Sequence, residues 1–265
     1  MTVATPPAAG ASCSRQIRGG VQVPGDNRDM DAISRYLSGE DFDDDFRYQP
    51  RMSFAPLARG DLLEQWCAGR SVLHVGFADH QPLIAARVAD GGWLHARLSR
   101  SARQCHGIDI NRQAVEAARL LGFQHVHALD IHAAESEGFL RGLGVDLVMV
   151  PDVLEHLGDP AAFMARLAQV FPAADFVVSV PNGLALRNAV NMLGGVERVN
   201  TDHRAWFSPY TLSKVLADAG LRVEELRGCM VSPAGSLKGR LLRGLVRRRP
   251  LGADVLVARA RVGMS

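Results

Sequence analysis

Cysteine is scarce in this sequence, and its spacing does not pair one cysteine with another. The four cysteines among 265 residues stand at positions 13, 67, 105 and 229, without a CxxC pair or a cysteine and histidine finger. This pattern excludes a disulfide scaffold and indicates reduced thiols in a cytoplasm. No window approaches the roughly 18 apolar residues of a membrane span. Residues 1–20 lack the basic start and apolar stretch of a secretory signal. We therefore expect a cytoplasmic protein.

An excess of charge of one sign is also missing. Lys and Arg together number 30 and Asp and Glu number 28, so the formal net charge is +2. Such a balance predicts no nucleic-acid partner, because wrapping a polyanion needs a strongly basic surface. The composition is 47% hydrophobic and 22% charged, which excludes collagenous and wholly disordered classes. The length favours one large domain with appendages.

The chain divides into a tail, a cap and one main domain. Residues 1–28 are rich in Ala, Pro, Gly and Ser without periodicity, so we expect a disordered tail. Residues 29–69 predict an N-terminal helical cap or lid, which carries an acidic run at 40–45. Residues 70–265 form the main domain, with a basic excursion at 230–252.

Short apolar runs rich in Val and Ile alternate with helical segments in the main domain. This alternation is typical of βα units that build a parallel sheet with helices on both faces. Asn111, Asp159 and Ser208 stand at the starts of three helices as N-caps. The expected strands cover residues 71–77, 106–110, 126–131, 145–150, 176–180, 222–227 and 254–261. The expected helices cover residues 57–66, 113–121, 161–171 and 210–219.

Three successive strand ends carry residues suited to a nucleoside. The first strand runs into Gly76, where small residues let the backbone approach a ligand. The second ends at Asp109, whose carboxylate could accept hydrogen bonds from the vicinal hydroxyls of a ribose. The third ends at Asp130, whose carboxylate could meet an adenine amino group. In an open α/β sheet such ends line the ligand site.

The fourth expected strand runs into the sequence PDVLEHL at residues 151–157. This segment resembles the fourth-strand motif of class I S-adenosylmethionine-dependent methyltransferases. Four further segments add to the resemblance: WLHARL at 93–98, GID at 107–109, SVPN at 179–182 and DHRAWFS at 202–208. The resemblance covers about residues 70–228. It implies a Rossmann-like class I methyltransferase fold, with a seven-stranded, mostly parallel sheet and an antiparallel last strand.

The resemblance also implies which residues bind S-adenosylmethionine (SAM). Gly76, Phe77 and Ala78 would lie beside its methionine portion, and Asp152 near its amino acid group. Asp109 would bind the ribose hydroxyls. The adenine would lie on Asp130 and Ile131. The complete implied set is Gly76, Phe77, Ala78, Asp109, Ile110, Asp130, Ile131 and Asp152.

Departures from the family pattern leave a second interpretation open. The family usually shows an acidic residue before a glycine-rich loop, whereas this sequence has His74 at that position and Phe77 and His80 in the loop. The missing acid removes an anionic anchor, and an imidazole could crowd the carboxylate of SAM. The alternative to an enzyme is a non-catalytic methyltransferase-like protein that binds or regulates a partner.

Because SAM supplies an activated methyl group, the main catalytic group that the protein must provide is a proton acceptor. Histidine is the natural base near neutral pH. We place His156, beside Glu155, ahead of His203 as the candidate base. A hydrogen-bonded structural histidine is the open alternative for each of the two.

The connection at residues 183–206 is long for a βα link, which is typical of a substrate lid. Its polar residues suit an acceptor such as a sugar hydroxyl: Arg187, Asn188, Asn191, Arg198 and Trp206. We expect O-methylation of a small molecule, a saccharide or a lipid-linked glycan. No metal site is expected, because His125 and His127 share a strand face without a Cys or carboxylate to complete a ligand set.

Residues 237–249 combine apolar residues at helical spacing with six cationic residues and no acid. Such a helix could lie on an anionic membrane, as a peripheral contact at its inner face, close to a lipid-linked acceptor. The open alternative is a helix that packs its leucines on the domain. Nucleic acid is a weaker interpretation, because aromatic residues are absent from the segment.

Overall fold

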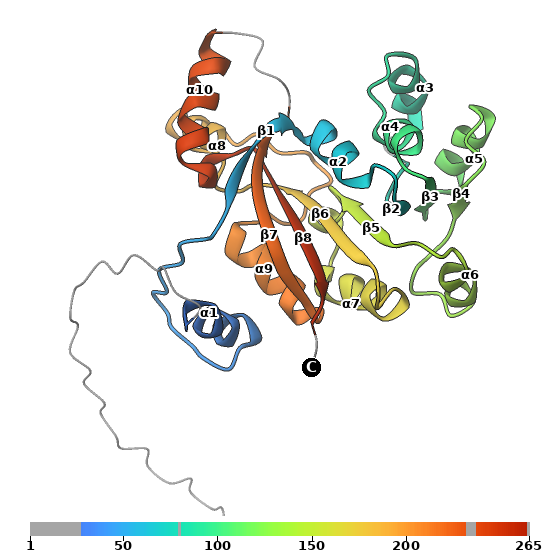
Figure 1. The fold of residues 1–265 in the computed structure, drawn as a ribbon. Helices are drawn as coiled ribbons and strands as arrows, with labels where there is room; N and C mark the ends of the chain where they lie inside the picture. Colours follow the sequence, from blue (N-terminus) through green and yellow to red (C-terminus); the bar gives the residue numbers. More distant parts are fainter. Residues whose placement is uncertain (1–27, 79–80, 232–236, 264–265) are drawn as a thin grey trace, which may run out of the picture.

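The computed structural model describes residues 28–78, 81–231 and 237–263, so the tail predicted for residues 1–28 lies outside the described residues except for its last position. One eight-stranded sheet runs through the molecule, with helices on both faces (Figure 1). Its strand order is β1-β7-β8-β6-β5-β2-β3-β4. The strands are β1 (Ser53–Ala58), β2 (Ser71–Val75), β3 (Gln104–Asp109), β4 (Val126–Ala128), β5 (Leu147–Pro151), β6 (Asp175–Pro181), β7 (Leu221–Met230) and β8 (Val255–Val262).

The helices alternate with the parallel strands, as the sequence pattern predicts. They are α1 (Arg28–Ser38), α2 (Arg59–Cys67), α3 (Gln81–Ala89), α4 (Leu94–Ser101), α5 (Arg112–Leu120), α6 (Ser136–Gly142), α7 (Pro160–Val170), α8 (Leu186–Leu193), α9 (Pro209–Asp218) and α10 (Leu237–Arg248). Two 3₁₀ turns, η1 (Leu154–His156) and η2 (Pro250–Gly252), complete the elements.

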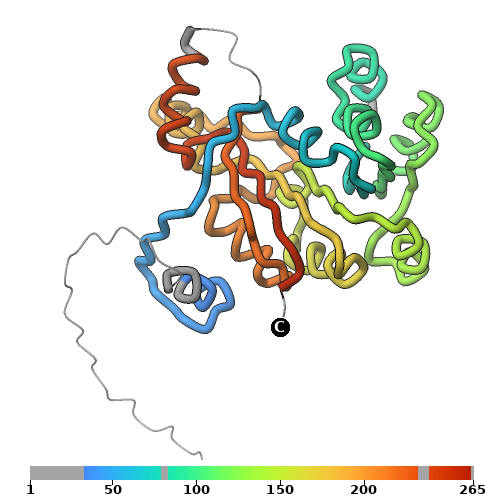
Figure 2. Tube along the Cα trace, in the orientation of Figure 1, coloured from blue at the N-terminus to red at the C-terminus, as the bar shows by residue number. Residues whose placement is uncertain are grey.

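The last strand, β8, runs antiparallel to both of its neighbours, β6 and β7, and the other pairings are parallel. The mostly parallel sheet with an antiparallel last strand is therefore confirmed. The predicted count of seven strands is wrong, because β1 adds an eighth at the edge. β1 pairs with β7, from the other end of the chain (Figure 2).

β1 escaped the sequence prediction because it lacks the marks of an interior strand. It contains Pro56, and its burial does not alternate strictly from one residue to the next. Proline has no amide hydrogen and is confined to edge positions in sheets. The sequence predicts a helical cap or lid for residues 29–69, whereas the structure has α1, an extended segment, β1 and α2 there.

Predicted caps start three of the helices. The side chain of Asn111 accepts a hydrogen bond from Ala114 N, that of Asp159 from Ala162 N, and that of Ser208 from Thr211 N. These bonds satisfy amide groups that have no partner inside a helix.

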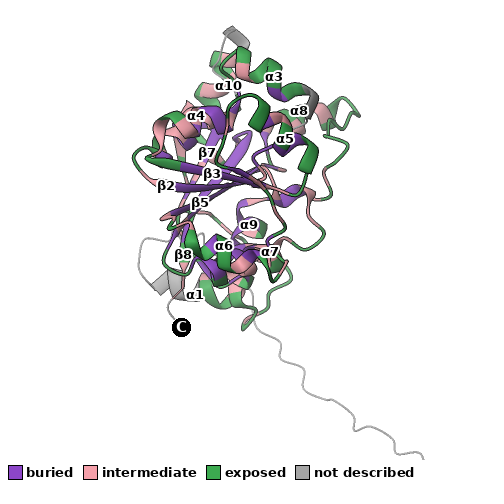
Figure 3. Cartoon of the chain, turned by 90° about the vertical axis from the view of Figure 1, so that its right-hand side faces the viewer, coloured by how far each residue is buried: buried purple, intermediate pink, exposed green. Residues whose placement is uncertain are grey.

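The core lies on both faces of the sheet, and its strands are the most buried part of the chain (Figure 3). On one face, α2 and α4 pack Leu62, Leu63 and Leu98 against the strands. On the other, α7 and α9 pack a larger cluster that includes Leu167 and Leu212. No helix of the described residues is long and apolar enough to cross a membrane.

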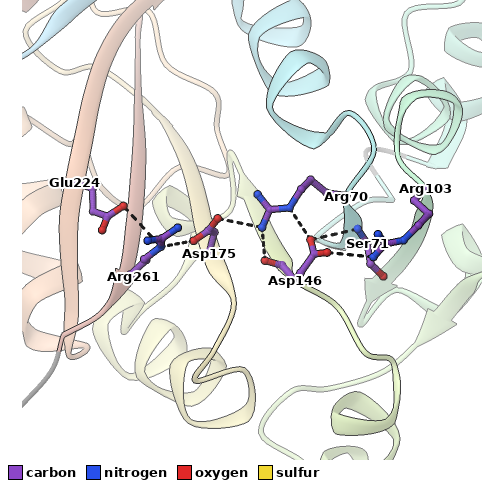
Figure 4. Close-up of polar contacts among 7 residues, drawn as sticks. All are labelled: Arg70, Ser71, Arg103, Asp146, Asp175, Glu224 and Arg261. Atoms are coloured by element: carbon purple, nitrogen blue, oxygen red, sulfur yellow. Dashed lines mark hydrogen bonds and ion pairs between the residues drawn. The ribbon is translucent and has the colours of Figure 1, made fainter.

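Charged residues join four strands at the edge of the sheet where the parallel strands begin (Figure 4). Arg70 Nε donates to Asp146 Oδ1 over 2.7 Å, and Arg70 Nη2 donates to Asp175 Oδ2 over 3.0 Å. Arg261, on β8, also donates to Asp175. Because these residues occupy the amino ends of β2, β5 and β6, the opposite edge is the one available to a ligand.

The N-terminal segment packs against α9. Tyr36 stacks on Phe46 with ring centroids 4.3 Å apart, and Phe46 and Tyr48 lie against Tyr210. Lys214 Nζ donates to the carbonyl oxygen of Leu37 over 2.5 Å. These contacts anchor the segment on the domain. A lid function for the acidic run at 40–45 stays a prediction.

Candidate functional site

The turn after β2 requires glycine. Gly76 has a φ of +68°, and a Cβ at this position would lie 2.5 Å from Cγ2 of Val153. Phe77 follows with its side chain buried against Trp93 and His95. Its ring therefore faces the core, and only its backbone is available to a ligand. His80 and Asp79 lie outside the described residues.

His74 occupies the family's usual acidic position and is fully buried, with its Nδ1 3.2 Å from Nδ1 of His95. Burial lowers the pKa of His74 well below its usual value and that of His95 to about 3, so both rings are neutral at neutral pH. Neither ring supplies the negative charge that the family pattern has there.

Asp109 lies at the exit of β3, half-buried, beside the turn at Gly76. Its Oδ2 accepts from Ala78 N over 3.2 Å and its Oδ1 from Asn111 N over 2.8 Å. A carboxylate has about four acceptor positions, so lone pairs remain for a ligand. The next residue, Ile110, exposes its side chain to solvent at the strand end.

The residues at the end of β4 offer fewer contacts to an adenine than the resemblance implies. Asp130 is exposed, and its Oδ1 accepts from His132 N over 2.9 Å. Ile131 is buried in the core beside Leu140. Only the backbone of Ile131 is therefore available to an adenine.

Asp152 follows β5 in a left-handed conformation, with a φ of +54°. Its Oδ1 accepts from Ser179 Oγ over 2.8 Å, and its Oδ2 lies 2.6 Å from Nη1 of Arg59. The sequence analysis missed Arg59. No local motif marks this arginine, since its place at the site depends on β1 and α2 packing beside β5 and β6.

Glu155, His156 and His203 come together from segments almost fifty residues apart. The rings of His156 and His203 are 4.8 Å apart, and Nε2 of His203 lies 4.0 Å from Oε1 of Glu155. The amide of Arg204 donates to the Glu155 carbonyl over 2.7 Å, which holds the loop against η1. The sequence named all three residues, and the structure brings them together.

The hydrogen bond of His156 determines which of its nitrogens is basic. Its Nδ1 lies 3.2 Å from the carbonyl oxygen of Asp202. Because a carbonyl oxygen only accepts, Nδ1 of the neutral ring carries the hydrogen and Nε2 keeps its lone pair. His156 is thus arranged to take up a proton at Nε2.

Glu155 is fully buried, and neither of its carboxyl oxygens has a hydrogen-bond partner among the described residues. Burial, with a smaller contribution from the charge of Asp152, raises the pKa of Glu155 to about 8. Burial and the neighbouring His156 lower the pKa of His203. Ligand atoms of Glu155, His156 and His203 lie within 4.8 Å of one another, so these are the described residues that could hold a metal ion. The sequence pattern predicts no metal site.

A cavity of about 840 Å³ lies beside this cluster, beyond the end of β6. We call it the α8 pocket. Its wall next to the cluster is Trp206, whose ring centroid is 6.2 Å from that of His203. Most of the wall area of the pocket is apolar, and the apolar lining residues are Leu184, Ala185, Ala189, Met192, Val196, Trp206 and Phe207.

Two of the polar residues expected to bind a sugar, Asn188 and Arg187, already contact the protein itself. Asn188 Nδ2 donates to the carbonyl oxygens of Asn182 and Gly183, each over 3.2 Å. Arg187 Nε lies 3.5 Å from Oδ1 of Asp254. Asn191 and Arg198 line the pocket, but most of its wall is apolar. The pocket therefore favours an apolar acceptor over a saccharide.

Comparisons with known proteins place this geometry in context. A family model described as "Methyltransferase domain" matches residues 88–226. The ubiquinone biosynthesis O-methyltransferase of Hahella chejuensis is 27% identical over 230 residues, which cover 80% of this chain and 89% of that protein. The enzyme of the same name from Aromatoleum aromaticum is 29% identical over 175 residues, covering 63% of this chain and 70% of that protein.

Among solved structures, the small RNA methyltransferase HEN1 is similar with a TM-score of 0.50 and 16% identity. The match covers 83% of this chain and 28% of that one. At this identity the likeness concerns the fold alone.

Proposed function

The chain belongs to the methyltransferase-domain family and is a class I SAM-dependent methyltransferase, and from this premise we propose that it methylates an oxygen of a small apolar acceptor. The observation that carries the proposal is the apolar α8 pocket next to the cluster of Glu155, His156 and His203. A donor site at the strand ends and an acceptor pocket beside a candidate base are the parts that such a transfer needs.

The residues at the strand ends fit SAM. The Asp109 carboxylate has free acceptor positions for the ribose hydroxyls, and the exposed Ile110 offers an apolar surface to the adenine. Arg59 and Asp152 supply opposite charges for the carboxylate and the ammonium of the amino acid portion. The group itself supplies an electrophilic methyl on a sulfonium centre.

His156 is the base in this proposal. The acceptor hydroxyl would give its proton to Nε2 of His156, which would leave an oxygen nucleophile for the methyl group that SAM would supply. The bond from Nδ1 of His156 to the Asp202 carbonyl stabilises the imidazolium that results. His203 lies beside His156 and within 4.0 Å of the buried Glu155, and these two residues would hold the ring of His156 in position.

Oxygen is the proposed acceptor atom, because the curated relatives are named as O-methyltransferases. The names of these relatives refer to ubiquinone biosynthesis and mention no saccharide or glycan. The apolar wall of the α8 pocket gives a sugar few hydrogen-bond partners, so the proposed acceptor is neither a saccharide nor a lipid-linked glycan.

Two variants test the proposal by calorimetric titration with S-adenosylhomocysteine and by turnover with small phenols. Asp109→Ala should weaken binding by roughly 1–3 kcal/mol, about 5- to 150-fold, because a charged hydrogen-bond acceptor is lost. His156→Ala should lower turnover by about 100-fold or more without a comparable loss of binding. Unaltered affinity in Asp109→Ala would refute the ribose assignment, and an unchanged rate in His156→Ala would eliminate the base.

The second candidate is a non-catalytic methyltransferase-like binding or regulatory protein. It is favoured by one observation, the replacement of the acidic anchor by the neutral, buried His74. Failure of the wild-type chain to bind S-adenosylhomocysteine would move this candidate to first place.

We also propose that the protein is cytoplasmic and makes a peripheral contact with an anionic membrane. The unpaired spacing of its cysteines supports the compartment. The six cations within residues 237–249 support the contact.

A further inference from the structure

Helix α10 uses only part of its apolar surface for packing. Val246 is buried against Met230 and Ala253, and Leu242 packs on the same cluster. Leu186, at the start of α8, belongs to this cluster too, so α8 and α10 are neighbours. They lie together at the upper left of the molecule (Figure 1). The expected packing of leucines on the domain is thus true of one side of the helix.

The other side of α10 has apolar and cationic side chains in solvent. Leu241 is 69% exposed and Leu245 is 53% exposed. Three consecutive arginines at the end of the helix, Arg247, Arg248 and Arg249, are exposed as well. No acidic residue occurs between positions 237 and 249. A soluble helix has no folding reason to combine exposed leucines with unbalanced positive charge.

Helix α8 continues this apolar surface. Met192 is 68% exposed and Leu193 is 84% exposed, and Val190 and Val196 are also exposed. Met192 and Val196 line the α8 pocket at the same time. The exposed apolar residues of α8 therefore border the cavity that we assign to the acceptor.

We propose that the exposed sides of α8 and α10, the α8–α10 surface, dock on an anionic lipid bilayer. Two neighbouring helices there combine apolar tips with a one-sided cationic charge, which is the pattern of an interfacial helix on acidic lipids. A protein partner would not require three consecutive exposed arginines without an acid. A nucleic acid would not require exposed leucines and methionine.

The same surface determines how the acceptor arrives, a step that rests on the proposed function. Because α8 forms both the docking surface and a wall of the pocket, the pocket opens next to the bilayer. An oxygen nucleophile that carries an apolar chain would partition into the lipid and reach the pocket from there. The inferred substrate class is a lipid-soluble, hydroxyl-bearing molecule.

Co-sedimentation with vesicles tests the surface, using the full chain. Wild type should sediment with vesicles of phosphatidylglycerol and phosphatidylcholine, and at least tenfold less with phosphatidylcholine alone. Leu241→Ser with Leu245→Ser, and separately Arg247→Gln with Arg248→Gln and Arg249→Gln, should each lower the partition coefficient about tenfold. Because these side chains are exposed, the melting temperature should stay unchanged.

Matched controls come from the far parts of the chain. Leu120→Ser removes an 82% exposed leucine on α5, and Arg222→Gln removes an exposed arginine at the start of β7. Neither should alter sedimentation. Absence of wild-type sedimentation, equal binding to both vesicle types, or equal losses in the controls would overturn the proposal. A dimer that only the α10 variants dissociate, without vesicle binding, would assign the surface to a second copy.

Two further readouts separate this inference from the proposed function. Calorimetry with S-adenosylhomocysteine measures the affinity of the donor site in the same variants. A chain that sediments with vesicles but does not bind S-adenosylhomocysteine would refute the proposed function and leave the docking surface standing. For delivery, a phenol with a long alkyl chain in anionic vesicles should be methylated several-fold more slowly by the triple arginine variant. The unsubstituted phenol in solution should react at the wild-type rate, and equal rates for both phenols would overturn the delivery step.

Discussion

Glu155 illustrates how a single side chain acquires its chemistry from burial. Its carboxyl group is buried beside His203, without a hydrogen-bond partner among the described residues. A charge there would lose its hydration without compensation, so the group keeps its proton to about pH 8. A protonated Glu155 cannot act as a base, which is why the proposed function gives that role to His156.

This burial makes stability depend on pH at the level of one residue. The unfolded chain ionises Glu155 at its ordinary pKa of about 4.5, whereas the folded chain holds the proton to about pH 8. The native state binds more protons between these values, so stability falls as the pH rises through that window. Between pH 5 and pH 8 the loss from this group is on the order of 3 kcal/mol.

Glu155→Gln removes the titration and keeps the shape. We expect the variant to lose less unfolding free energy than wild type between pH 5 and pH 8, measured by urea unfolding at both pH values. Glu116→Gln, at an exposed glutamate of α5, should follow wild type. Equal losses in Glu155→Gln and wild type would contradict the assignment.

At the scale of the element, the turn between β2 and α3 determines whether the donor site can form. Gly76 needs both a left-handed backbone and the absence of a side chain, because Val153 lies directly over it. Val153 begins the turn that carries Glu155 and His156, so the two turns support each other.

Gly76→Ala should therefore disturb both turns. The backbone strain costs about 1–3 kcal/mol, and the clash with Val153 adds to it. Gly144→Ala is the matched control, since Gly144 has a φ of +59° and nothing within 4 Å of an added Cβ. Thermal unfolding should show a larger loss for Gly76→Ala, and calorimetry should show weaker binding of S-adenosylhomocysteine only there. Equal losses of thermal stability and of S-adenosylhomocysteine affinity in the two variants would contradict the role given to Gly76.

At the scale of the whole molecule, the sheet separates stability from function. Arg70, Asp146, Asp175 and Arg261 connect the strands at the amino edge of the sheet (Figure 4). The proposed donor site and the α8 pocket lie at its carboxyl edge. Substitutions at the amino edge should alter stability without altering the chemistry.

Asp175→Asn tests this separation. Burial opposes the charge of Asp175, but hydrogen bonds from Arg261 and Arg70 outweigh it and lower the pKa of the carboxyl. The lowered pKa means that the stabilisation is present above about pH 4 and is lost as the pH falls further. At pH 7 the variant should lose about 1–3 kcal/mol, and the difference from wild type should shrink toward pH 3. Affinity for S-adenosylhomocysteine should not change, and a large change would contradict the separation.

Local interactions let the sequence alone determine much of this protein. Alternating apolar runs predicted seven of the eight strands, and N-caps predicted the starts of α5, α7 and α9, because both depend on residues close in the chain. The sequence also assigned Asp109 and Glu155 to strand ends, which meet at one edge in any parallel sheet.

Only the tertiary structure decided the remainder. The pairing of Asp152 with Arg59, the meeting of Glu155 with His203, and the edge strand β1 depend on contacts between distant segments. The apolar character of the α8 pocket was equally hidden, because it depends on which polar side chains, such as Asn188, already bind the backbone. Packing determines those partners, and no spacing along the chain encodes them.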